Sequence, residues 1–122
     1  MKGFYITLAL FSALIICGIL NFLFVNNVHN EMNEMVAEIS RAPCAENEER
    51  IQNLSDYWEK TNTKLSFSVS YTAIDTVTNL IDSIKLYNDV GDSKQLAYSI
   101  ELLINAIDNI KRLENFSVKN IF

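Results

Sequence analysis

The chain begins with one long uncharged apolar segment, and charged residues become frequent only after it. Phe4 to Val25 comprises 22 residues without Asp, Glu, Lys, Arg or His. As a helix with a rise of about 1.5 Å per residue, this segment would measure roughly 33 Å, enough to cross the ~30 Å hydrocarbon core of a bilayer. The pattern therefore predicts a transmembrane helix over residues 4–25.

After this span, apolar residues recur at steps of three and four, which is typical of amphipathic helices. They predict that the spanning helix continues through about 26–41 and is followed by helices at about 45–63, 66–88 and 93–115. The single Pro and three Gly of the chain also favour long helices over a turn-rich β fold. The predicted fold is all-α: an N-terminal transmembrane helix leading into a small extracytoplasmic antiparallel helical bundle in residues 26–122.

The boundary between the second and third helices is open in the sequence, because the apolar period continues in phase from Ile51 to Tyr87. One helix over residues 45–88 would be about 66 Å long and would enter the bilayer with its charged residues. We therefore predict a break near residues 61–66. Pro43 is predicted to end the first helix, and Gly91 in the sequence DVGDS predicts the last turn.

Charge predicts the orientation of the span. Lys2 and the amino terminus flank one end, and the next basic residue is Arg41. The positive-inside rule then places residues 1–3 in the cytoplasm and residues 26–122 outside. The apolar run exceeds the roughly 7 to 15 residues of a signal-peptide core, which favours an uncleaved single-pass anchor in the cell membrane. The start KGFYITL is also similar to a prepilin cleavage site, so a pilin-like assembly subunit is an alternative, although Leu8 stands where that family has a glutamate.

Composition narrows the chemistry. Ten Lys and Arg against fifteen Asp and Glu give a net charge of −5, which disfavours nucleic acid as a partner. The single histidine, His29, is expected to be solvated near the membrane, without a metal. Cys17 and Cys44 are predicted to lie in different environments, so they should not pair with each other. No catalytic cluster or cofactor motif is present, and we predict no enzymatic activity, no cofactor and no metal site.

Two sets of residues are candidates for packing or binding. Trp58, the only tryptophan, is predicted to anchor the core, and ligand stacking is the alternative. The last residues of the chain form an apolar tail that should arrive near the outer membrane surface. This tail predicts contact with another membrane protein or with a second copy of the chain, and folding back onto the bundle is the alternative: Phe116, Val118, Ile121 and Phe122.

These features together predict an accessory or interaction subunit in the membrane, with a ligand-binding, sensor-like helical domain as the alternative. The short charged start, the span, Trp58 followed by Lys60 and Lys64, and the sequences YTAID, YNDVGD and VKNIF resemble an uncharacterised bacterial family, domain of unknown function 4363. Members of that family often have histidine where this chain has Tyr71. The resemblance implies a membrane-anchored helical protein of low-GC Gram-positive bacteria, sometimes encoded beside a multi-pass membrane protein. It implies no established activity.

Overall fold

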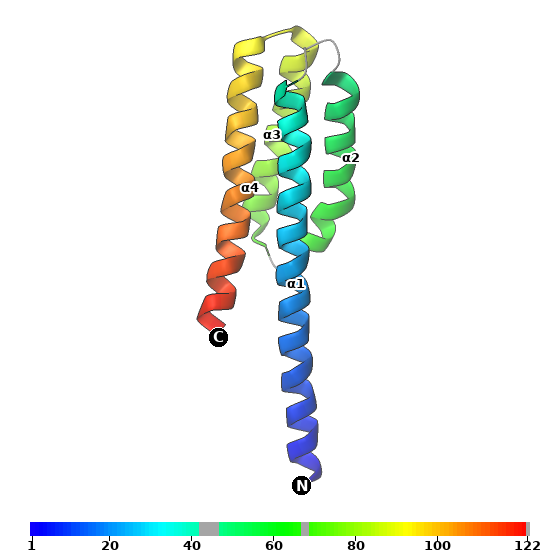
Figure 1. Cartoon of the computed structure of the whole chain (residues 1–122), viewed down its shortest axis with the longest axis vertical. Coiled ribbons are helices and arrows are strands. Elements are labelled where there is room, and N and C mark those ends of the chain that lie inside the picture. The colour runs from blue at the N-terminus through cyan, green and yellow to red at the C-terminus, as the bar shows by residue number, and fades with distance from the viewer. Residues whose placement is uncertain (42–46, 67–68, 122) are drawn as a thin grey trace.

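Four helices make up the part of the chain that the structure, a computed structural model, describes: residues 1–41, 47–66 and 69–121, with side-chain surroundings through residue 112. The helices are α1 (Lys2–Arg41), α2 (Asn47–Leu65), α3 (Tyr71–Val90) and α4 (Ser93–Ile121), as Figure 1 shows. The prediction of an all-helical fold is confirmed. Among the described residues, one helix, α1 near the N-terminus, is long and apolar enough to cross a membrane.

Helix α1 is unbroken over 40 residues, but its two halves have different surroundings. The first half stands free of the other helices except near its upper end, and its large apolar side chains are exposed, with Phe4 at 66% and Leu14 at 71%. The second half lies inside the bundle, where Val25 and Met32 are 2% and 1% exposed. One helix therefore supplies both the free apolar segment and a central part of the core.

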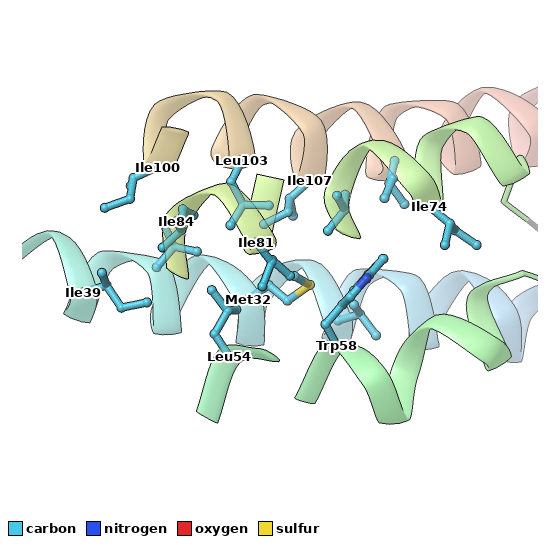
Figure 2. Close-up of a cluster of buried hydrophobic side chains, with 14 of the residues drawn as sticks. Met32, Ile39, Leu54, Trp58, Ile74, Ile81, Ile84, Ile100, Leu103 and Ile107 are labelled. Carbon is cyan, nitrogen blue, oxygen red and sulfur yellow. The ribbon is translucent and has the colours of Figure 1, made fainter. Parts of the chain in front are cut away.

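The core is formed where α1 packs on α2 and α4 and where α3 packs on both α2 and α4. Each helix contributes apolar residues at steps of three and four, because these steps return to the same face of a helix. Figure 2 shows side chains from all four helices meeting in one cluster, with these residues labelled: Met32, Ile39, Leu54, Trp58, Ile74, Ile81, Ile84, Ile100, Leu103 and Ile107.

Local capping sets the ends of α3. The Ser70 hydroxyl accepts a hydrogen bond from the Ala73 backbone N–H, which satisfies a free donor in the first turn. At the other end Gly91 has φ 74° and ψ 22°, and its N–H donates to the Asn88 and Tyr87 carbonyls. Gly91 adopts this left-handed conformation without the steric cost that a Cβ would add.

The helix boundaries differ from the expected ones at several places. Helix α2 ends at Leu65, and α3 begins at Tyr71 instead of residue 66, because Ser70 caps it. Helix α4 continues to Ile121 instead of ending near residue 115, and no Pro or Gly follows Ser93 to interrupt it. The predictions for Pro43 and Cys44 fall outside the described residues.

Candidate functional site

A polar cluster joins α1 to α4 at the end of the bundle nearest the free part of α1. His29 Nε2 lies 2.6 Å from Asp108 Oδ1, and the histidine side chain is only 14% exposed against 46% for Asp108. Asn33, one turn further along α1, places its Nδ2 3.2 Å from the same ring nitrogen. The His29 Nδ1 faces Asn30 Oδ1 at 3.4 Å. The cluster therefore consists of one imidazole, one carboxylate and two amides.

The chemistry of the partners assigns the protons. A carboxylate accepts hydrogen bonds, so the 2.6 Å contact requires His29 Nε2 to carry the proton and to donate a hydrogen bond to Asp108 Oδ1. Asn33 Nδ2 is also a donor, so with this tautomer its 3.2 Å approach to Nε2 is a contact and not a hydrogen bond. On the other side of the ring, the Asn30 oxygen can accept from Nδ1 when the imidazole is positively charged. Asn33 Oδ1 is buried without a hydrogen-bond partner. This arrangement ties two helices together with a hydrogen bond between ionisable groups.

The prediction of a solvated His29 was wrong, because the ring is mostly covered and contacts Asp108. Asp108 is separated from His29 by 79 positions in the sequence. Its carboxylate stands on the polar border of a regular amphipathic helix, where charged residues are ordinary. Only the antiparallel packing of α1 on α4 brings the two side chains together.

Trp58 lies in the core and is 2% exposed. Its Nε1–H donates to Thr78 Oγ1 on α3 at 2.8 Å, and the same hydroxyl donates to the Ile74 carbonyl at 3.0 Å. The bond to the helix backbone turns the Thr78 oxygen toward the indole. Because the buried polar edge of the indole has a partner, the tryptophan connects α2 to α3 without an unsatisfied donor.

Among the described residues, Tyr57, the neighbour of Trp58, is the group whose ionisation the fold changes most clearly. Burial raises the pKa of the Tyr57 phenol, and the negative charge of Glu31 on α1 raises it further, while a hydrogen bond with Thr61 acts in the opposite direction. Both larger effects disfavour the phenolate, since it would be poorly solvated and close to another negative charge. Tyr57 therefore stays protonated to a higher pH in the folded chain than in an exposed position.

Small cavities lie between the helices of the described part of the chain. The one at the end of the bundle furthest from the free part of α1 measures about 190 Å³ and lies between α1, α2 and α4. It includes Asn47, which is 2% exposed and whose Oδ1 has no hydrogen-bond partner. Its lining is mixed: Ile39, Ser40, Asn47, Ser93, Leu96, Ala97 and Ile100.

The remaining candidate residues are placed as follows. Cys17 is exposed on the free half of α1. Within residues 1–41, 47–66 and 69–121, no three His, Cys, Asp or Glu side chains converge as metal ligands would. Phe116, Val118 and Ile121 belong to α4, but their side chains are beyond the described ones, and Phe122 lies outside the described residues altogether.

Comparison with known proteins places the chain by family. Neither the curated proteins nor the solved structures contain a match to it. The family model described as "Domain of unknown function (DUF4363)" matches residues 23–121, which include the end of the free half of α1 and all of the bundle. The resemblance seen in the sequence is thereby confirmed, and the chain belongs to the DUF4363 family.

Proposed function

We propose that this chain is a single-pass protein of the cell membrane, with its N-terminus in the cytoplasm and its helical bundle outside. The observation that carries the proposal is the unbroken α1, whose first half exposes apolar side chains and whose second half is buried in the bundle. The position of Lys2 at one end of the span and the absence of basic residues before Arg41 support the orientation.

The bundle acts, in this proposal, as an accessory subunit that binds another membrane protein or a second copy of itself. A continuous helix holds the bundle at a constant height and angle to the span, since a helix bends little without a proline or an inserted group. A bundle held in a fixed position by its membrane helix is suited to contact a partner protein in the same membrane. Two exposed apolar side chains near the α3–α4 turn, Leu86 at 57% and Tyr98 at 58%, are candidate contacts.

Site-specific photocrosslinking in the native membrane tests the proposal. Photoreactive residues replace Leu86 or Tyr98 in two variants, and a control variant carries one in place of Asn53, which is exposed on α2. We expect one discrete product that contains a membrane protein or a second copy, formed from one face of the bundle only. Equal labelling from all positions, or no product at any of them, contradicts the proposal.

Ligand binding is the second candidate function, because the cavity beside Asn47 has room for a small molecule. A volume of about 190 Å³ exceeds the ~150 Å³ that holds benzene in an apolar cavity, and the unpartnered Asn47 Oδ1 favours a ligand that donates a hydrogen bond. An NMR screen of small amines and alcohols should shift the signals of Leu96 and Ile100 if this function is correct. The shifts should vanish in Asn47→Leu.

A further inference from the structure

Helices α1 and α4 run antiparallel, and two contacts define which of their residues lie at the same level. At one end of the bundle, Ile39 of α1 lines the same cavity as Leu96 and Ile100 of α4. Toward the other end, His29 contacts Asp108. Each later residue of α4 therefore lies level with an earlier residue of α1.

Helix α4 continues far beyond the His29–Asp108 contact. From Asp108 to Ile121 the helix advances 13 residues, or roughly 20 Å. Thirteen residues before His29, α1 has reached Ile16, which is nine residues inside the apolar span that ends at Val25. Figure 1 shows the same relation, since the end of α4 lies level with the free part of α1 and beyond the ends of α2 and α3.

One strip of α1 in this region is partly covered. Ile15, Gly18 and Phe22 are half-buried, and they continue the face of Val25 and His29 at steps of three and four. The other large aliphatic side chains of the region are at least half exposed: Leu14, Ile16, Ile19, Leu20 and Leu23. Of the four helices, α4 is the one whose end comes to this level in Figure 1. This strip reaches Ile15, at levels that the end of α4 also reaches.

We propose that the last turns of α4, residues 112–121, enter the membrane leaflet nearest the bundle, level with residues 16–25 of α1, and contact lipid acyl chains. The inference rests on the proposed function, in which residues 4–25 span the membrane. Arg112 lies four residues after Asp108, and Val25 lies four residues before His29, so Arg112 and the end of the span are level. Lys111 and Arg112 then stand at the depth of the phosphate groups, where basic residues are favoured.

The order of residues after Arg112 suits this placement. Glu114 follows within one turn and stays near the headgroups. Phe116, Val118 and Ile121 follow at depths where apolar side chains are favoured. Lys119 comes seven residues, or about 10 Å, after Arg112, and a charge at that depth is costly, which limits how deeply the segment can enter. The tail thus lies deeper than a position at the outer surface of the membrane, and two helices hold the bundle instead of one.

Spin-label accessibility in liposomes tests the depth of α4. Full-length protein carrying Cys17→Ser and Cys44→Ser receives one label at a time through Phe116→Cys, Ser117→Cys or Val118→Cys. A helix separates these three positions by about 100° each, so at least one of them faces away from α1. Leu14→Cys serves as the lipid control and Tyr98→Cys as the water control, since both side chains are exposed. The liposomes contain phosphatidylcholine and phosphatidylglycerol.

We expect the label on the open face of α4 to be accessible to oxygen and protected from a water-soluble nickel chelate, like the label at Leu14. The inference is overturned if all three α4 labels are as accessible to nickel as the label at Tyr98. It is also overturned if all three are protected from both reagents, because protein and not lipid then covers the segment. Accessibility of the Leu14 label to nickel would instead contradict the proposed function, because the first half of α1 would then not lie in the membrane.

Discussion

At the scale of single residues, the indole of Trp58 and the hydroxyl of Thr78 form one packing unit. Trp58→Ala should lower the free energy of unfolding by about 3 to 5 kcal/mol, because the side chain is 2% exposed and its removal leaves a cavity. Thr78→Val should cost about 1 to 3 kcal/mol, because it leaves the buried indole N–H without its acceptor. Urea unfolding in detergent micelles, followed by circular dichroism, measures both.

Exposed hydroxyls of α3 provide the control for this unit. Thr76→Val removes a hydroxyl that is exposed and bonds its own helix at Thr72, so it should change the stability by less than about 0.5 kcal/mol. If Thr78→Val is as mild as Thr76→Val, the hydrogen bond to Trp58 does not contribute to stability.

The His29–Asp108 hydrogen bond belongs to the same scale. Asp108→Ala should lower the free energy of unfolding by about 1 kcal/mol, less than a fully buried charged hydrogen bond contributes, because the carboxylate is 46% exposed. Trp58 fluorescence during urea unfolding is the measurement, since this residue is the only tryptophan and is buried. Asn105→Ala, one turn away on α4 and exposed, is the control and should leave the free energy of unfolding nearly unchanged.

Tyr57 should make stability depend on pH in the alkaline range. Its pKa in the folded chain is raised above the ordinary 10.0, so the unfolded chain loses the phenol proton first as the pH rises. The stabilisation is complete below pH 10 and decreases above it, because deprotonation then favours the unfolded state. Between pH 9 and 11, Tyr57→Phe should therefore lose stability less steeply than the unchanged chain. Tyr98→Phe, at an exposed position, should keep the original slope, and equal slopes in all three proteins would disprove this role of Tyr57.

At the scale of helices and turns, the connection between α3 and α4 depends on one backbone conformation. Gly91 has φ 74°, and no other atom lies within 4 Å of where a Cβ would be added, so Gly91→Ala should meet backbone strain and no steric clash. The expected cost is about 1 kcal/mol. Gly91→Asn should cost less, because asparagine adopts left-handed geometry more readily than alanine. Urea midpoints of the two variants make the comparison, and an Asn variant no better than Ala would contradict this account.

At the scale of the whole molecule, the orientation in the membrane is open to direct measurement. Asn79→Cys, in a chain with Cys17→Ser and Cys44→Ser, presents a thiol on the exposed side of α3. A membrane-impermeant maleimide should label it in intact cells with a permeable wall, because the proposed orientation places the bundle outside. Lys2→Cys should be labelled only after lysis. The reverse pattern would require the N-terminus to lie outside.

The sequence alone determined the helical class, the long apolar helix and most of the core. Periodicity is a local property, and steps of three and four place Met32, Ile81 and Leu103 on inward faces whatever the neighbouring helix is. It also indicated the turn at Gly91, since few residues other than glycine adopt left-handed geometry without strain. The family resemblance likewise needed no structure.

Tertiary packing decided which polar residues meet and how far the helices reach past one another. His29 finds Asp108, and Trp58 finds Thr78, only because separate helices pack in one register, and hydrogen-bond partners from different helices leave no periodic signal in a sequence. The same register brings the end of α4 level with the apolar span. The proposed depth of this end in the membrane depends on how far α4 extends beyond the contact between Asp108 and His29. The apolar pattern of α4 alone does not show which residue of α1 lies at that level.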